Sequence, residues 1–472
     1  MSRRTLFGSV AALAALTAMP VTASARPLPR VTQLPDAGAK GLLIWDVTGL
    51  GYIAEEFMIE GKADVLESVS MADAVDMSKR NGLEDFLRRD FNRTVVAEAR
   101  PYATRVVVYR PIDMSRFSGR ILLEVLHPSG GGRANVWQRT YDLLADRGDI
   151  TIGIQPPFNV KELREGDPVR YGKLHAEHPT QLWDVVTDVA RLTKTVGEGG
   201  LLGGAVARHQ VLAGFSYTGV ATANYANFQH DRARLADGRP LIDGYMPMGS
   251  ATFVRPLDVP VIRMTTQSEF DGIQGIRARV PDSDDPKGRC RLYEVAGAPH
   301  STVPLPVGAA LAPTKTVPEP AGLPRFSPET CQQGFPETSY RNDFPLHLVI
   351  EGIYVNIFEW IENGVVPPHA PLIEVDAEGR TLVDEFGNAR GGLRLPEVTV
   401  PIATYGVGAK GPCGNFGYTK PFTIEEKRRL YGNKAAYVSR VRQASETLFT
   451  ERFVTAKGKN RLIGLAAATE AF

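Results

Sequence analysis

The segment from Gln210 to Gly219 constrains the fold of this chain more than any other. It begins with the apolar run Val211-Leu212-Ala213, continues through Gly214-Phe215-Ser216, and passes at once into a helix-compatible stretch that ends at Phe228. A serine held between a strand and a helix must lie on a sharp turn, which pushes its hydroxyl out of the sheet. We therefore expect a strand, a tight turn and a helix in immediate succession.

The same alternation of apolar runs and helical periodicity extends from about Gly119 to His300. The predicted strands are Arg120–His127, Ile150–Gln155, His209–Gly214, Ile242–Met248, Val259–Thr266 and Arg291–Val295. The predicted helices are Ala134–Asp146, Gln181–Val196 and Tyr217–Phe228, and Thr180 is placed to cap the second. Strands that alternate with helices predict an α/β fold with a mostly parallel sheet covered on both faces.

Two further strands are predicted before this core, as an antiparallel leading edge at Gly51–Glu60 and Tyr102–Tyr109. The polar stretch from Phe158 to Pro179 follows a core strand, and its position suits a cap excursion over the C-terminal edge of the sheet. We expect residues 26–472 to form a single elaborated domain, with its core at about 100–302.

The C-terminal extension, about 303–472, is expected to be helical and to pack on the core. After a Pro-rich passage, apolar residues from Leu346 to Ile361 keep helical spacing, and Gly364 can end that helix. A hairpin is predicted at Pro371–Asp384. Thr423 followed by Glu426 is a capping-box signature for a final helical region.

Residues 1–25 are typical of an export signal. The pair Arg3-Arg4 precedes an uncharged stretch that ends in Ala23-Ser24-Ala25, a small-x-small cleavage site. The paired arginines resemble a twin-arginine signal. A membrane anchor is the alternative, but the apolar stretch is shorter and more alanine-rich than a good span. We expect a periplasmic or secreted protein whose mature chain starts near Arg26 and has no membrane segment.

Charge and cysteine content exclude several classes of function. The net charge is +1, from 54 basic and 53 acidic residues, so nucleic acid and anionic membranes are not expected partners. Of the three cysteines, Cys331 and Cys413 are the pair that would tie down the C-terminal part. The spacing His175-x-x-His178 and the acidic turn Asp282–Asp285 are both explained as loops. No metal and no cofactor are predicted.

The position of Ser216 on a sharp turn is typical of a nucleophile elbow. A serine nucleophile needs a histidine base, and that histidine needs an orienting carboxylate. In this arrangement the chain order is serine, acid, histidine, with acid and base on loops after later strands. Of the downstream histidines, His230 comes too early, His347 lies in the long helix, and His369 follows no strand. His300 ends the loop after the strand Arg291–Val295 and is the predicted base.

The acid is expected after the strand Val259–Thr266. Glu269 and Asp271 are the two candidates, and counting from the start of the strand favours Glu269. Asp258 precedes the strand and would lie at the wrong end of the sheet.

The oxyanion formed during attack on a carbonyl needs two N–H donors. The backbone of Tyr217, directly after the serine, is the first expected donor. Ser129 or Gly130, in the glycine-containing loop after Arg120–His127, is the second. Thr218 occupies the usual second-glycine position of the Gly-x-Ser-x-Gly pattern, where we expect crowding.

The sequence resembles a family of exported bacterial α/β-hydrolase-domain proteins that carry a Gly-Phe-Ser-x-Ser/Thr-Gly elbow. The resemblance implies an α/β-hydrolase fold across nearly the whole mature chain, and Thr218 matches the family's small hydroxyl residue. The matching segments are Gly214–Gly219, Asp243–Pro247, Pro281–Asp284, Glu294–Gly297 with His300, Gly391–Pro396 and Pro401–Tyr405.

The resulting hypothesis is a serine esterase that acts on a small-molecule carboxylic ester through an acyl-enzyme. Two alternatives remain open from the sequence. An acyltransferase would use the same residues with an alcohol in place of water. A non-catalytic binding protein would keep the fold without the chemistry.

Overall fold

The computed structural model describes residues 26–35, 46–67, 86–88, 90–128, 132–158, 160–195, 201–270, 279–302, 335–408, 414–470 and 472. The predicted export signal and the predicted Cys331–Cys413 pair lie outside this set. Cys290 is described and is a buried free thiol. Within these ranges, no helix is both long and apolar enough to span a membrane.

One ten-stranded sheet organises the described residues, in the order β1-β2-β3-β5-β4-β7-β8-β9-β10, with β6 paired to β3. The strands from β5 to β10 in that order run parallel, and the leading strands β1, β2 and β3 are antiparallel. Their bounds are β1 Arg30–Gln33, β2 Tyr52–Leu66, β3 Val95–Pro111, β4 Arg120–Val125, β5 Ile150–Ile154, β6 His175–Ala176, β7 His209–Phe215, β8 Gly244–Met248, β9 Val261–Thr266 and β10 Cys290–Val295.

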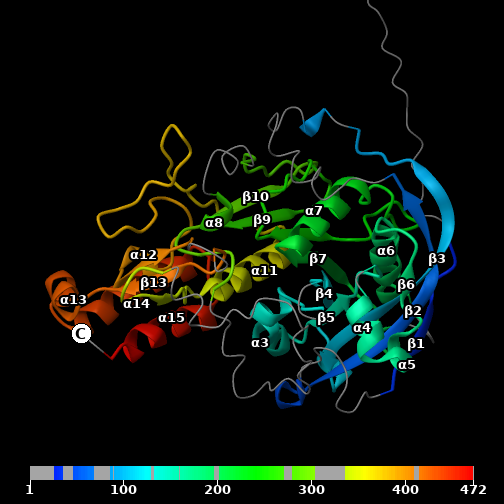
Figure 1. Cartoon of the computed structure of the whole chain (residues 1–472), viewed down its shortest axis with the longest axis horizontal. Helices are drawn as coiled ribbons and strands as arrows, with labels where there is room; N and C mark the ends of the chain where they lie inside the picture. The colour runs from blue at the N-terminus through cyan, green and yellow to red at the C-terminus, as the bar shows by residue number, and fades with distance from the viewer. Residues whose placement is uncertain are drawn as a thin grey trace, which may run out of the picture.

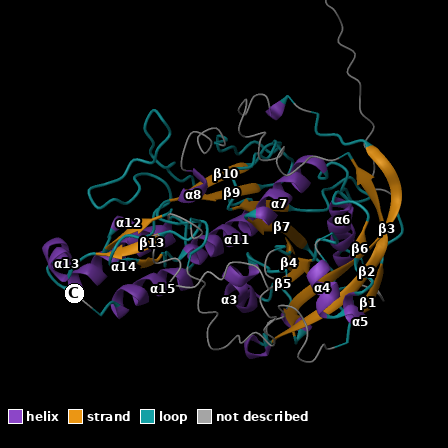
Figure 2. Ribbon diagram, in the orientation of Figure 1, coloured by secondary structure: helices purple, strands orange, loops and turns teal. Residues whose placement is uncertain are grey.

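Helices cover both faces of the sheet (Figure 2), as the alternating pattern predicts. Leu122, Val211 and Met246 point to the face covered by α3 Trp137–Arg147 and α11 Leu346–Asn363. The intervening strand residues Ile121, Leu123 and Leu212 pack instead with α6 Gln181–Thr193 and α7 Tyr217–Phe228. The predicted α/β architecture is confirmed, and each core strand lies within about two residues of its predicted bounds.

The predicted cap of α6 is wrong in detail. The hydroxyl of Thr180 does not bond to the first turn of its own helix. It donates to the carbonyl of Leu66 at 3.1 Å and accepts the N–H of Leu66 at 3.0 Å. A tertiary contact with the end of β2 therefore takes the side chain that local sequence assigns to the helix.

The excursion after β5 folds as α4 Lys161–Gly166, α5 Pro168–Tyr171 and β6. It lies against the long β2–β3 ribbon, because β6 pairs with Tyr102 and Ala103 of β3. On β3, this pairing lies past the end of β5, because Ile154, the last residue of β5, pairs with Val106. Arg170 and Tyr171 of α5 both donate to the buried carboxylate of Glu56 on β2.

Within the C-terminal extension, α11 lies on the sheet beside α3, and the elements after α11 pack on that face (Figure 1). Its side chains Leu448, Phe453 and Leu462 belong to the same buried cluster as the strands. The capping box of Thr423 and Glu426 is present. The elements are β11 Tyr340–Arg341, α12 Pro396–Thr399, β12 Ala403–Gly406, β13 Tyr418–Pro421, α13 Ile424–Tyr431, α14 Lys434–Thr450 and α15 Ala456–Ala468.

The predicted hairpin at Pro371–Asp384 exists only as isolated antiparallel bridges. Val375 pairs with Thr381 around a turn at Gly379, whose φ is 84°. Ile373 pairs with Gly391 and Val383 with Ala389, so the chain folds back twice without forming a strand.

Candidate active site

Ser216 joins β7 to α7 in a backbone conformation that non-glycine residues rarely adopt. Its φ is 64° and its ψ is −126°. Such a conformation costs on the order of 1–3 kcal/mol, so surrounding contacts must impose it. The N–H of Ser216 donates to the carbonyl of Met248 at 3.0 Å, and its carbonyl accepts the N–H of Val220 at 3.1 Å. These bonds hold the hydroxyl at the C-terminal end of the parallel strands.

Crowding at this turn falls on Gly214 and Gly219, and not on Thr218 as expected from the sequence. A Cβ on Gly214 would lie 2.1 Å from the carbonyl oxygen of Thr218, and one on Gly219 would lie 2.2 Å from that of Met248. The hydroxyl of the buried Thr218 donates to the carbonyl of Phe215 and accepts its N–H, each at 3.0 Å. The threonine therefore closes the turn that the serine occupies.

The Gly219→Ala substitution is expected to lower the free energy of unfolding by about 2–3 kcal/mol, because the new methyl group would collide with backbone that cannot move aside. Urea denaturation measures the change. The matched control is Gly464→Ala on α15, where nothing lies within 4 Å of the new methyl group. That control should gain about 0.5–1 kcal/mol from higher helix propensity. Equal effects at the two positions would contradict the packing described at Gly219.

Ser216, His300 and Glu269 form a continuous hydrogen-bonded series. The Nε2 atom of His300 lies 2.8 Å from the Oγ of Ser216, and its Nδ1 hydrogen-bonds to Oε1 of Glu269. The other oxygen of Glu269 accepts the backbone N–H of Thr266 at 2.6 Å. Glu269 lies on the short helix α8 Gln267–Phe270, directly after β9. The structure thus brings together three residues that the sequence singled out.

The loop that carries His300 is bonded to the segment that carries Glu269. Gln267 accepts the N–H of Gly297 through its side chain at 2.8 Å and donates its own N–H to the carbonyl of Ala298 at 3.1 Å. The amide of Asn342 donates to the carbonyl of Gly297 at 3.1 Å. These bonds fix the imidazole and the carboxylate relative to each other.

The family model described as "Alpha/beta hydrolase domain" matches residues 17–464 of the chain. The chain belongs to this alpha/beta hydrolase family. Membership indicates a hydrolase, in agreement with the fold and with the resemblance drawn from the sequence.

Known proteins add little to the family assignment. A crystal structure named as a dienelactone hydrolase from Klebsiella pneumoniae is 15% identical to this alpha/beta hydrolase, with a TM-score of 0.24. The match covers 41% of this chain and 79% of that one. No curated protein is similar enough to count as a relative.

His230 and His369, two other histidines that follow Ser216 in the chain of this alpha/beta hydrolase, each have a carboxylate partner. His230 is buried between the hydroxyl of Tyr245, at 2.9 Å, and the carboxylate of Asp258, at 2.6 Å. Asp258 precedes β9 and so lies at the opposite edge of the sheet, as expected. His369 is exposed and bonds to Asp282 at 2.7 Å.

Burial lowers the pKa of His347, in the first turn of α11, from 6.5 to about 4, and the nearby Arg139 acts in the same direction. Between these values the unfolded chain binds a proton that the folded chain does not. The free energy of unfolding should therefore fall as pH drops from about 6.5 to about 4. The His347→Gln variant should show a shallower fall, by up to about 1.4 kcal/mol per pH unit. Urea denaturation across this range tests it, and parallel pH profiles would contradict it.

Of the predicted oxyanion donors, only Tyr217 lies among the residues that the structure describes. Tyr217 is the first residue of α7, so its N–H has no acceptor within the helix. Its ring lies 6.0 Å from that of His127, edge to face, which brings the loop after β4 alongside the elbow. Burial lowers the pKa of His127 to about 4, with a smaller contribution from the neighbouring His300. Ser129, Gly130 and the alternative acid Asp271 lie outside the described residues, so their roles stay predictions.

Glu124 is a residue that the sequence analysis did not single out. Its buried carboxyl group accepts the N–H of Val136 at 2.7 Å and of Trp137 at 3.0 Å, so it ties the end of β4 to the start of α3. Burial raises its pKa to about 8, against the effect of these hydrogen bonds. An acidic residue inside an apolar strand is the signal that could have identified it.

The two sequence motifs with metal-ligand character have other partners. His175 bonds to the carbonyl of Lys173 at 2.8 Å, and His178 to the hydroxyl of Thr180 at 2.9 Å. Asp282 accepts the N–H of Leu292 at 2.9 Å. Across the described part of the chain, no three His, Cys, Asp or Glu side chains are grouped so that they could hold a metal ion.

Proposed function

We propose that this alpha/beta hydrolase is a serine esterase that cleaves a carboxylic ester. Ser216 acts as the nucleophile, His300 as the base and Glu269 as the residue that orients the imidazole. The observation that carries the proposal is the series of hydrogen bonds from Ser216 Oγ through both nitrogens of His300 to Glu269. A hydroxyl bonded to an imidazole, which is bonded in turn to a carboxylate, is the arrangement that activates serine.

In the first half-reaction, Ser216 Oγ attacks the ester carbonyl carbon while its proton passes to His300 Nε2. The carbonyl oxygen becomes an oxyanion, which accepts a hydrogen bond from the N–H of Tyr217 and from a second donor predicted at Ser129 or Gly130. The bond to the leaving alcohol then breaks, and His300 returns the proton to the alcohol oxygen. An acyl group remains on Ser216.

In the second half-reaction, water attacks the acyl-enzyme. His300 takes a proton from the water, and the new tetrahedral oxyanion uses the same N–H donors. Collapse of this intermediate releases the carboxylic acid and returns the proton to Ser216. Throughout, the Glu269 carboxylate accepts the Nδ1–H of His300 and stabilises the imidazolium form. We propose an ester substrate and not an amide by analogy, because esters are the commonest substrates of enzymes with this fold.

Labelling with a fluorophosphonate probe tests the nucleophile. One probe per protein molecule is expected, on the peptide that contains Ser216. The Ser216→Ala variant should not be labelled, whereas Ser439→Ala, a matched change on α14 of the extension, should be labelled like wild type. A wild-type protein that remains unlabelled while folded would contradict the proposal.

We further propose that the protein acts outside the cytoplasm after cleavage next to Arg26. Arg26 is ion-paired with the buried Asp184, and its carbonyl accepts a hydrogen bond from Arg191 at 2.8 Å. These contacts keep the predicted start of the mature chain attached to α6. N-terminal sequencing of protein recovered from the periplasm or the medium should begin near Arg26, and an uncleaved, cytoplasmic product would contradict this.

A further inference from the structure

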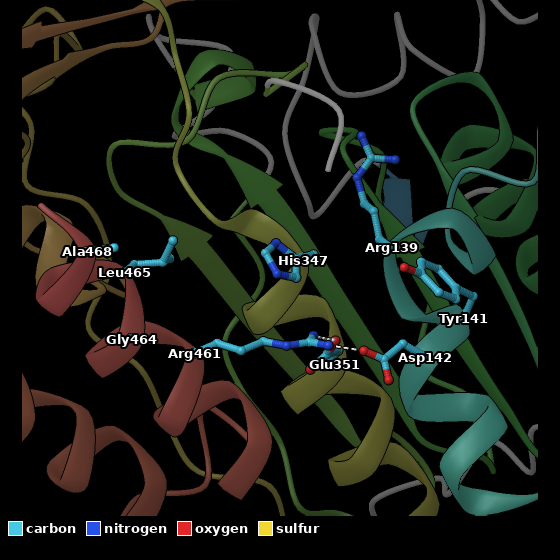
Figure 3. A pocket seen from close by; sticks show the side chains of 9 residues that line it. All are labelled: Arg139, Tyr141, Asp142, His347, Glu351, Arg461, Gly464, Leu465 and Ala468. Atoms are coloured by element: carbon cyan, nitrogen blue, oxygen red, sulfur yellow. Dashed lines mark hydrogen bonds and ion pairs between the residues drawn. The ribbon is translucent and has the colours of Figure 1, made fainter. Parts of the chain in front are cut away.

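A cavity of about 450 Å³ lies between α3, α11 and α15 (Figure 3). Its walls include Arg139 and Asp142 of α3, His347 and Glu351 of α11, and Arg461 and Leu465 of α15. This volume is within the range of small-molecule sites, which combine apolar walls with a few placed polar groups.

Arg139 connects this cavity with Ser216. The guanidinium carbon of Arg139 lies 4.5 Å from the centre of the Phe215 ring. Phe215 directly precedes Ser216, and its ring centre lies 5.4 Å from that of His300. Figure 3 shows the Arg139 side chain directed away from the Arg461–Asp142 ion pair. A group bound by Arg139 would therefore lie beside the residues proposed to carry out the chemistry.

The charges in the cavity leave Arg139 without a carboxylate partner. Asp142 is paired with Lys457 and Arg461, and Glu351 lies 3.1 Å from Arg461. Among the described residues Arg139 has no ion pair, and its side chain donates to the carbonyl of Asn135 at 2.8 Å.

Glu124 is the acid with the strongest electrostatic effect on Arg139, but it does not form an ion pair with it. Its two carboxyl oxygens accept hydrogen bonds from the backbone N–H groups of Val136 and Trp137 instead. Burial lowers the pKa of Arg139 to about 10, so the guanidinium is still charged at neutral pH. A half-buried charge with no carboxylate partner carries a desolvation cost that an anionic ligand would offset.

His347 supplies a second polar group to the same cavity. In the described part of the structure its imidazole makes no hydrogen bond, and the low pKa already noted keeps the ring neutral, with one N–H to donate. A cation next to a neutral N–H donor matches a carboxylate, because guanidinium binds its two oxygens in a planar fork.

We propose that the natural substrate is an ester that carries a carboxylate, and that Arg139 binds this carboxylate in the cavity while His347 donates a hydrogen bond to it. The proposal rests on the esterase function proposed above and narrows it to anionic esters. Arg139 then determines specificity, whereas Ser216, His300 and Glu269 carry out the reaction.

The test compares each anionic ester with its neutral methyl-capped form. In one pair, the mono-4-nitrophenyl ester of glutaric acid and its methyl ester, the charge is on the acid side. In the other, 4-carboxyphenyl acetate and its methyl ester, it is on the alcohol side. The ratio of kcat/KM, anionic over neutral, should exceed one in at least one pair and fall about 10- to 100-fold in Arg139→Met. Arg139→Lys should retain part of the preference.

The matched control is Arg147→Met, the same change in the last turn of α3. It should leave the ratio unchanged, because Arg147 is paired with Asp149. If Arg147→Met lowers the ratio as much as Arg139→Met does, the preference comes from the overall positive electrostatic potential and not from a contact with Arg139, and the proposal is overturned. The proposal is also overturned if the wild type cleaves both forms of each pair equally well, although the esterase function would then stand.

A binding measurement separates the two proposals if no ester is cleaved. Calorimetric titration of the Ser216→Ala protein with the same esters should give tighter binding of an anionic form, and Arg139→Met in that background should remove the difference. Equal binding of both forms, or no binding of either, would overturn the cavity assignment. The thermal unfolding midpoint of each variant confirms that the proteins compared are folded.

Discussion

The His300→Ala variant is expected to hydrolyse a 4-nitrophenyl ester with a kcat about 10⁵- to 10⁶-fold below wild type. Without the imidazole at 2.8 Å from its Oγ, Ser216 has no group to accept its proton. The hydroxyl then attacks as a neutral alcohol, and the leaving alkoxide must depart without a proton. Residual activity would come from binding and from the oxyanion donors alone.

His369→Ala is the control for this measurement. His369 also pairs with a carboxylate, that of Asp282, but lies on the exposed surface. Steady-state kinetics, with kcat calculated per molecule of folded enzyme, should give an unchanged kcat for this variant. If His300→Ala keeps more than about 1% of wild-type activity, a role as general base is excluded, since such a role is worth far more.

The Glu269→Gln variant should lose about 10⁴-fold in kcat while it stays folded. Glutamine fills the same space and can still accept the N–H of Thr266. It carries no charge, however, so it neither stabilises the imidazolium nor enforces the form of His300 with a proton on Nδ1. The loss should appear in kcat more than in KM, because the charge on His300 develops in the transition state.

Two further substitutions sharpen this result. Asp258→Asn removes another carboxylate bonded to a buried histidine, His230, at the opposite edge of the sheet, and should leave kcat nearly unchanged. Asp271→Asn examines the alternative acid. If Asp271→Asn abolishes activity while Glu269→Gln preserves it, the assignment of the acid must be exchanged between the two positions.

Much of the fold could be predicted because the strands are buried on both faces. Ile121, Leu122 and Leu123 are fully buried, so an unbroken apolar run marks a central strand in the sequence itself. The elements that local sequence did not predict correctly depend on distant partners. Thr180 bonds to the end of β2, and the segment after Pro371 folds through isolated bridges that leave no periodic pattern.

Part of the candidate site could likewise be predicted from the sequence, and part of it could not. Ser216, Glu269 and His300 follow the parallel strands β7, β9 and β10, and parallel strands bring their C-terminal ends to one edge. Chain order therefore predicted that a serine, an acid and a histidine would lie close together, with Glu269 and Asp271 both open as the acid. Arg139 and His347 could not be identified like this. Their shared cavity exists only because α15 closes it, and a contact across more than 300 residues leaves no local trace in the sequence.

The position of α15 has a consequence for biosynthesis. Arg461 contacts Asp142 across 319 positions, and Leu462 completes the apolar cluster under α3 and α11. A nascent chain that leaves the ribosome from its N-terminus therefore cannot complete this cluster until α15 has emerged. Until then, Leu348 of α11, which lies beside Gly458 of α15, has no cover from that helix and is open to chaperones or other unfinished chains. Folding of this face is thus completed only after α15 has been synthesised, and loss of α15 would expose a hydrophobic surface on α3 and α11.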